Sequence, residues 1–322
     1  MQLIERTAWL VGRGVMVLFG ISVLLFLIFF ATPGADPAAR LAGRGAAPET
    51  LALVRAEYGL DRTMPVQYAG LMRRLFVTRD LPSFVNRGQL VVPAVLRAAP
   101  MTLALALGSA VIWMAAGLGI GLVAAGWRGT GLDRVVVAAG LVGISVPAFW
   151  LGSVVTLVTQ GEGAQGGVFG WVPPLGMPAR GAGEWVRGMV LPWLTLAVLY
   201  AGVYGRVLRT GLVSGLGQDY ARTARAKGLG EWRVAVRHVL PNAAVPALAL
   251  LGLDLGGLLG GGTVLVEVVF GLHGIGRLTF DALRSLDLAM VMACVLYGSV
   301  FVVVANAGAE GLQSLLDPRK RT

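Results

Sequence analysis

The chain has 322 residues, of which 56% are hydrophobic and 14% are charged. An ordinary soluble domain carries about 25% charged residues, and a soluble core could not bury this much apolar surface, so the composition favours a lipid bilayer as the solvent. The net charge of +10 could indicate nucleic-acid binding, but in an apolar chain basic residues more often set membrane topology. The single cysteine, Cys294, excludes an internal disulfide and a cysteine-based metal cluster.

Six apolar stretches are long enough to cross a membrane, which takes about 20 mostly apolar residues. They cover approximately residues 10–31, 99–125, 135–159, 188–205, 243–270 and 288–309. The first stretch follows Arg6 and Arg13 and precedes small residues, as a cleavable signal peptide does. Its length and the later spans favour a retained anchor.

The order of these stretches predicts an all-α membrane protein with six transmembrane helices. Residues 1–97 would form an N-terminal anchor helix and an external segment, 98–309 the membrane domain and 310–322 a tail. The external segment contains two helix-forming stretches, at 51–60 and from near Pro65 onward. It therefore predicts a small external subdomain between the first two spans.

Lysine and arginine indicate the orientation. With the N-terminus inside, the inside segments hold 14 of the 27 Lys and Arg residues and the short outside loops hold four. The external segment 32–97 holds the other nine, and loops of about 60 residues escape the charge rule. This bias predicts that both termini are cytoplasmic.

A basic segment separates the fourth span from the fifth, with seven Lys and Arg residues between Arg206 and His238. It is expected to form a helix hairpin in which Asp219 is the N-cap. Ala221, Ala224 and Gly228 recur at helical spacing and form a face of small residues.

The segment continues beyond a turn at Gly228–Gly230. Trp232, Val236 and Val239 then share one side of a second short helix, which Pro241 ends. The pattern allows an amphipathic hairpin that rests on anionic lipid, or a docking surface for a cytoplasmic protein. A helix that lies on lipid needs no face of small residues, so the pattern favours docking.

The spacing of this segment resembles the conserved cytoplasmic loop of ABC-importer permeases. Nine residues separate Gly228 from His238, and Leu240-Pro241 follows. The glutamate and first alanine of the family motif are Arg222 and Thr223 here, and Ala224 matches. TARAKGL followed by RHVLPNA is similar to the dipeptide/oligopeptide/nickel branch.

Further stretches resemble the same family in the same order: TPGADPA, YGLDRTMPVQY, SVPAFWLG, LPWLTLA, GGTVLVEVVFGLHGIGRL and NAGAEGLQSLLDPRKR. The likeness thus extends over nearly the whole chain. It departs at Glu310, where the family has an aspartate, and at RSLDLAM, where an Arg-Asp pair, an aromatic residue and proline are expected. These departures bear on the substrate branch.

The resemblance implies a type I ABC importer permease fold in a prokaryotic plasma membrane. The loop 219–241 would hold a coupling helix that sits in a groove on an ATPase subunit, where Arg222, Arg225 and Lys227 supply steering charge. The coupling residues implied are Asp219, Tyr220, Ala221, Arg222, Thr223, Ala224, Arg225, Ala226, Lys227, Gly228 and Leu229.

The partners implied are a second paralogous permease, two cytoplasmic ABC ATPase subunits, an extracytoplasmic solute-binding protein and membrane lipid, with no nucleic acid. The chain would be a non-catalytic translocation subunit that binds no cofactor, with ATP and Mg on the ATPases. It lacks the GxxxxGK[ST] phosphate loop. The two histidines, His238 and His273, lie far apart, so no metal site is expected.

Polar groups at membrane depth are costly and usually face a cavity or a partner. Asp254, midway through the fifth span, is either a pathway or gating residue or a structural carboxylate paired across a subunit interface or with water. Glu267, nearer the outer end, is either an anchor near the external mouth or an interfacial charge.

Two other classes of protein remain as alternatives. A self-sufficient secondary transporter or channel predicts inverted repeats and broken helices and leaves the basic segment unexplained. An intramembrane enzyme needs a nucleophile–base pair or metal ligands within the spans, which Asp254 alone does not supply. The resemblance instead implies a permease subunit that forms half of the translocation pathway for di-/oligopeptides or related small solutes; relatives of similar sequence handle dipeptides, longer peptides and nickel chelates, so the exact solute stays open.

Overall fold

The structure, a computed structural model, describes residues 2–30, 38, 47–86, 88–161, 169–176 and 181–316. The chain folds into two compact units, which are considered separately. Unit 1 contains Met1–Pro100 and Gly274–Val303, and unit 2 contains Met101–His273 and Val304–Thr322. The three-part division at residues 97 and 309 stays a prediction.

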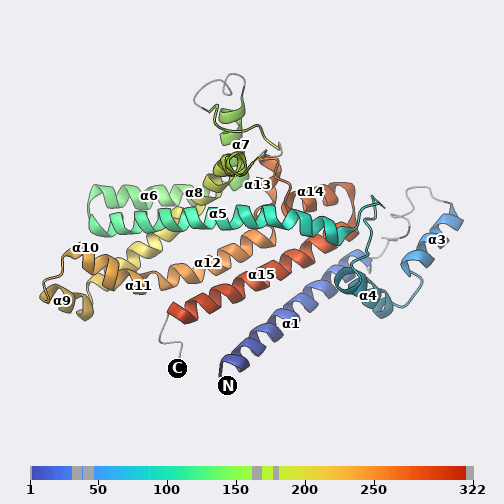
Figure 1. The fold of residues 1–322 in the computed structure, drawn as a ribbon, viewed down its shortest axis with the longest axis horizontal. Coiled ribbons are helices and arrows are strands. Elements are labelled where there is room, and N and C mark those ends of the chain that lie inside the picture. The colour runs from blue at the N-terminus through green and yellow to red at the C-terminus, as the bar shows by residue number, and fades with distance from the viewer. Residues whose placement is uncertain are drawn as a thin grey trace. The chain divides into compact units, whose positions relative to one another are not determined.

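Unit 1 holds the N-terminal helix and the external segment (Figure 1). Its elements are α1 (Gln2–Phe30), α3 (Pro48–Tyr58), α4 (Met64–Met72), the π-helical turn η1 (Arg73–Val77), α14 (Ile275–Ser285) and the first parts of α5 (Val91–Gly126) and α15 (Leu288–Leu316). The two helices predicted for the external segment are confirmed as α3 and α4. Pro65 lies in the first turn of α4, where its missing N–H costs nothing.

A buried carboxylate joins the external segment to the start of α15. Asp287 is 4% exposed, and its Oδ1 accepts the backbone N–H groups of Phe84 at 3.1 Å and Met290 at 3.2 Å. Its Oδ2 accepts the Ser83 hydroxyl. Asp287 therefore caps α15 and fixes the chain at Ser83, which gives the departure RSLDLAM a structural role.

Unit 2 contains the remaining helices (Figure 1). They are α6 (Gly131–Ser145), α7 (Ala148–Gln160), α8 (Ala182–Leu216), α9 (Asp219–Ala226), α10 (Glu231–Arg233), η3 (Val234–Val239), α11 (Leu240–Ala243), α12 (Val245–Gly257), η4 (Leu258–Gly262) and α13 (Val264–Val269), with the rest of α5 and the end of α15.

Glycines bring the long helices of unit 2 into close contact. A Cβ at Gly202 of α8 would lie 2.3 Å from the Cα of Gly140 in α6, and a Cβ at Gly117 of α5 would lie 2.6 Å from the Cβ of Tyr204. Helices in lipid associate through such close packing because no hydrophobic force drives them together. Large apolar side chains face outward, for example Val111 at 71% and Leu157 at 74% exposure.

The all-helical membrane fold is confirmed, although the helices do not reproduce all six spans. Among the described residues, five helical stretches are long and apolar enough to cross a membrane: Gly12–Phe30, Val91–Gly126, Ala182–Leu216, Val245–Gly262 and Leu288–Gly311. The predicted span 135–159 is divided between α6 and α7. Val146 is extended (φ −91°, ψ 126°) because the following Pro147 disfavours a helical residue before it.

The predicted fourth span was too short. α8 is 35 residues long and runs to Leu216, so Arg206 and Arg209 lie on this helix and not in the basic loop. Arg209 forms a bidentate ion pair with Asp133 of α6, at 2.5 and 2.6 Å. Two of the seven basic residues thus belong to a long apolar helix and not to the loop.

The predicted fifth span is broken. Gly261 has φ +136° inside η4, a conformation that side-chain-bearing residues rarely adopt, and the helix resumes as α13. Before the break, a Cβ at Gly252 would lie 2.3 Å from the Cβ of Ala309, so this glycine packs against the end of α15.

Candidate functional site

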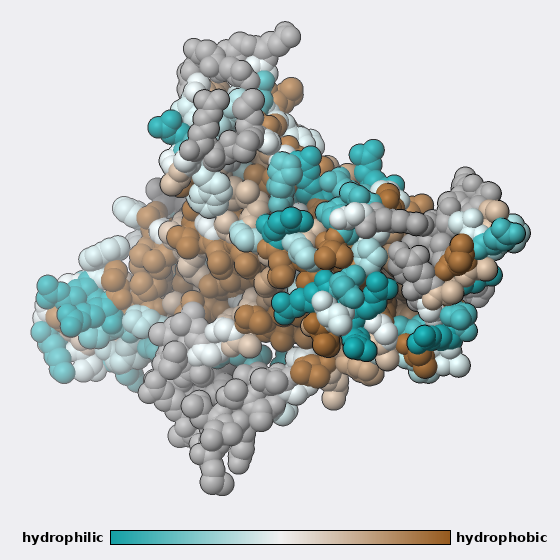
Figure 2. Space-filling model, turned by 45° about the vertical axis from the view of Figure 1, so that its right-hand side comes forward, coloured by the Kyte–Doolittle hydropathy of each residue, from teal (hydrophilic) through white to brown (hydrophobic). Residues whose placement is uncertain are grey.

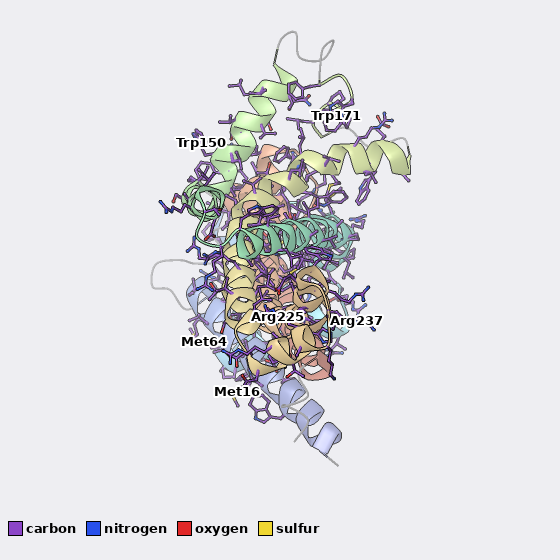
Figure 3. All side chains as sticks on the ribbon, turned by 90° about the vertical axis from the view of Figure 1, so that its left-hand side faces the viewer. Met16, Met64, Trp150, Trp171, Arg225 and Arg237 are labelled. Carbon is purple, nitrogen blue, oxygen red and sulfur yellow. The ribbon has the colours of Figure 1, made fainter. Side chains whose placement is uncertain are left out.

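The basic loop, residues 217–244, joins α8 to α12 and contains α9, α10, η3 and α11. Figure 2 shows hydrophilic side chains over this end of unit 2, beside a broad apolar surface. Figure 3 views the loop end on, with Arg225 over the loop ribbon and Arg237 at its edge. The predicted N-cap is wrong: Gln218 occupies that position without a side-chain bond, and Asp219 is the first helical residue.

The small residues of α9 face the chain itself. Ala221 is 0% exposed and Ala224 is 5% exposed. They pack in an apolar cluster with residues of α8, η3 and α11, namely Leu212, Val234, Val239 and Ala243. The small face therefore permits close approach between α9 and its own supporting helices, whereas the sequence pattern suggested approach by a second protein.

The second half of the loop differs from the prediction. Val234 and Val239 are buried at 0% exposure, whereas Trp232 is 69% exposed. The stretch is π-helical, so the spacing that would place Trp232 beside Val239 in an α-helix does not hold. Pro241 lies in the first turn of α11 and does not end a helix.

Gly228 ends α9. Its φ is +82°, and its N–H donates to the carbonyl of Arg225 at 2.9 Å while the N–H of Leu229 donates to that of Ala224 at 3.3 Å. These two bonds form a Schellman motif. Leu229 then packs against the apolar cluster, so the turn folds the chain back onto α8.

Arg225 connects the end of α8 to two elements of the loop, α9 and α10. Its Nη1 donates to the carbonyl of Leu216 at 2.9 Å, and its Nε and Nη2 donate to the two Glu231 carboxylate oxygens at 2.7 and 3.0 Å. The Arg225 hydrogen bonds lower the pKa of Glu231. Although the sequence suggested steering charge, Arg225 binds within the chain and fixes the ends of α8, α9 and α10.

The opposite face of α9 is exposed. It presents Asp219, Tyr220, Arg222, Thr223, Ala226, Lys227 and Gly228. Arg222 lies 3.4 Å from Asp219 in an exposed ion pair, and such a pair contributes little to stability. This face is therefore a solvent-accessible surface on a fixed support.

Two glycines of α8 allow the loop to lie against it, and both were missed in the sequence analysis. A Cβ at Gly211 would lie 3.0 Å from the Cβ of Ala243, and one at Gly215 would lie 2.4 Å from Cγ1 of Val239. The four-residue spacing of Gly211 and Gly215 is the signal that could have revealed them. Glu231 was also missed, since a lone acidic residue after a turn gives no distinctive pattern.

Comparison with known proteins identifies the family. Residues 117–322 match the family described as "Binding-protein-dependent transport system inner membrane component", and residues 3–106 match "Binding-prot-dependent transport system membrane comp, N-term". The chain belongs to this family. The permease is thus a multi-pass inner-membrane protein of a transport system.

Several curated proteins resemble this permease over almost their entire length. A putative peptide transport system permease protein of Brucella abortus (strain 2308) is 35% identical over 311 residues, 97% of each chain. The probable D,D-dipeptide transport system permease protein DdpB of Escherichia coli (strain K12) is 34% identical, over 95% of this chain and 94% of the other. The glutathione transport system permease protein GsiC of Salmonella choleraesuis (strain SC-B67) is 35% identical over 94% of each.

Asp254 of the permease has a hydrogen-bond donor within the chain. The hydroxyl of Tyr204 in α8 donates to its Oδ2 at 2.7 Å. Tyr204 is 0% exposed, whereas Asp254 is half-buried. The carboxylate thus joins α12 to α8, and a pathway role stays a prediction.

Glu267 of the permease lies inside unit 2. The side chain is 0% exposed, and its Oε1 accepts the hydroxyls of Thr102 in α5 at 2.8 Å and Thr263 at 3.0 Å. It therefore connects α13, just beyond the broken segment η4, to α5. This burial does not fit the interfacial-charge alternative.

Proposed function

We propose that this permease forms half of the translocation pathway of an ATP-driven importer of short peptides, and that α9 couples this pathway to cytoplasmic ATPase subunits. The peptide class is supported by the relatives, which are named as peptide, D,D-dipeptide and glutathione permeases. An extracytoplasmic binding protein and a second permease complete the proposed assembly, with both termini in the cytoplasm.

The observation that carries the proposal is the two-sided character of α9. One face is buried against α8, η3 and α11, and the other is exposed and polar. Because Arg225 and the Schellman turn fix the C-terminal end of this short helix and its buried face packs on α8 and α11, a force on the exposed face moves α8 and α11 with it. Rigid-body movement of packed helices is a common form of conformational switching.

The membrane helices offer a place where such movement can be absorbed. α12 follows the loop directly and ends at the break in η4, where Gly261 has left-handed backbone geometry. Glu267 holds α13 to α5 beyond the break. In the proposed cycle α12 moves with the loop, while α13 stays with α5.

Site-specific cross-linking tests the coupling role. We expect Thr223→Cys, on the exposed face, to form a disulfide with a cysteine on the ATPase surface in the assembled complex. Ala224→Cys is the matched control, since this neighbouring residue is 5% exposed. Equal cross-linking at both positions, or none at Thr223, would contradict docking through the exposed face.

The broken helix at η4 is a feature that the secondary-transporter alternative also predicts. Reconstitution separates the two functions. The permease in liposomes should move no peptide by itself, and should do so only with its ATPases, ATP and the binding protein. Peptide uptake by the permease alone, driven by an ion gradient, would favour the alternative.

A further inference from the structure

An apolar groove lies beside the loop, where the ends of α5 and α8 meet α10 and η3. Its volume is about 570 Å³, within the usual range for small-molecule sites. Apolar side chains of α5, α8 and η3 line it, including Leu122, Val123, Leu212, Leu216 and Ala235. The groove is separate from the exposed face of α9, because no residue of α9 lines it.

Two tryptophans at the groove indicate its depth in the bilayer. Trp127 follows the end of α5 and Trp232 lies in α10, and both line the groove. They are 55% and 69% exposed. Tryptophan is enriched where hydrocarbon meets the polar headgroups, because its ring is apolar and its N–H is polar. The groove therefore opens at the membrane–water boundary on the loop side.

Two exposed arginines are the chain neighbours of the tryptophans that line the groove. Each tryptophan is followed by an exposed arginine, Arg128 after Trp127 and Arg233 after Trp232. Such long side chains can leave their apolar stems at the groove and extend their cations to headgroup level. The acidic lining residue, Glu231, is already bonded to Arg225 at 2.7 Å, so its carboxylate does not offset the charge of these two arginines.

We propose that the groove binds one anionic glycerophospholipid of the leaflet on the loop side. An acyl chain lies between α5 and α8, and the phosphate lies between Arg128 and Arg233. An apolar lining, interfacial tryptophans and arginines next to them in the chain together match this class of ligand, since basic pockets beside membrane helices bind anionic headgroups. The bound lipid would hold α10 to α5 at the base of the loop. This inference does not depend on which solute is transported.

Native mass spectrometry of the assembled complex, with dioleoyl-phosphatidylglycerol and dioleoyl-phosphatidylcholine as probes, tests the proposal. The unmodified complex should bind one phosphatidylglycerol per permease in preference to phosphatidylcholine. Ala235→Trp fills the groove and should abolish this binding, whereas Leu157→Trp, on the outward face of α7, should not. Arg128→Gln and Arg233→Gln should each weaken phosphatidylglycerol binding by about fivefold, and Arg134→Gln on α6 should leave it unchanged.

Trp232→Ala provides a second groove variant, because this exposed side chain can be removed without disturbing the apolar cluster. It should weaken phosphatidylglycerol binding even if Ala235→Trp fails to fold. Unchanged binding in both groove variants would overturn the proposal, as would equal affinity for the two lipids. Binding by the isolated permease but not by the complex would show that another subunit covers the groove, and would overturn it as well.

Discussion

Gly228 and Gly230 are two residues apart and differ in backbone conformation. Gly228 has φ +82°, whereas Gly230 has φ −66° and ψ 151°, which any residue can adopt. A Cβ at either position would meet nothing within 4 Å. Conformation alone therefore distinguishes them, and they form a natural matched pair.

We expect Gly228→Ala to destabilise the loop by about 1 kcal/mol, since a left-handed residue with a Cβ costs roughly this amount. Solute-stimulated ATP hydrolysis by the assembled complex should fall, because the turn no longer holds α9 in place. Gly230→Ala should leave both thermal stability and stimulated hydrolysis near wild-type values. Equal behaviour of the two variants would refute the role of the turn.

The bond between Tyr204 and Asp254 distinguishes the two interpretations of that carboxylate. Tyr204→Phe removes the donor and leaves a half-buried carboxylate without it, so thermal stability of the purified complex should fall by about 1–2 kcal/mol. Asp254→Asn retains an acceptor oxygen and should cost less. If Asp254→Asn instead lowers peptide transport at unchanged stability, the residue acts in the pathway and not as a structural carboxylate.

At the scale of elements, the ion pair of Arg225 and Glu231 fixes α9 relative to α10. We expect Arg225→Glu or Glu231→Arg alone to reduce solute-stimulated ATP hydrolysis several-fold, and the double exchange to recover much of it. Lys227→Glu, an equal charge change on the exposed side of the same turn, serves as the control for loop positioning. It should weaken association with the ATPase and should not be rescued by Glu231→Arg.

The same pair predicts a pH dependence. Because the hydrogen bonds from Arg225 lower the pKa of Glu231 from its ordinary 4.5, the stability that the pair contributes is fully present above pH 4.5. It is lost as the pH falls through the lowered pKa. Thermal unfolding of the complex should therefore show no contribution of this pair to pH dependence between pH 6 and 8. A Glu231→Gln variant that changed the slope of stability with pH in that range would contradict it.

At the scale of the whole molecule, the proposed orientation in the membrane can be tested by labelling introduced cysteines. Its single cysteine, Cys294, is 2% exposed, so an introduced cysteine provides the reactive thiol without removal of the native one. Lys227→Cys should react with a membrane-impermeant maleimide only in inside-out vesicles, and Leu53→Cys of α3, where the leucine is 71% exposed, only in right-side-out cells. The reverse labelling pattern would show that the orientation in the membrane is opposite to the one proposed.

The sequence by itself determined that the chain lies in a lipid bilayer and that its fold is helical. It also determined the external helices α3 and α4 and the position of the basic loop. These depend on local composition and on the spacing of nearby residues, such as Pro65 at the start of α4 and Gly228 at the end of α9. The break of the fifth span at Gly261 was not predicted from the sequence.

Only the tertiary structure decided which way the side chains face and what they contact. Helical spacing groups Ala221 with Ala224 but cannot say whether their common face meets the same chain or another protein. Tyr204, the donor to Asp254, and Thr102, a donor to Glu267, lie 50 and 165 residues away in sequence, and such contacts arise only when the helices pack together. The spacing of nearby residues does not specify contacts between residues so far apart in the chain. The roles of these side chains therefore became visible only in the packed structure.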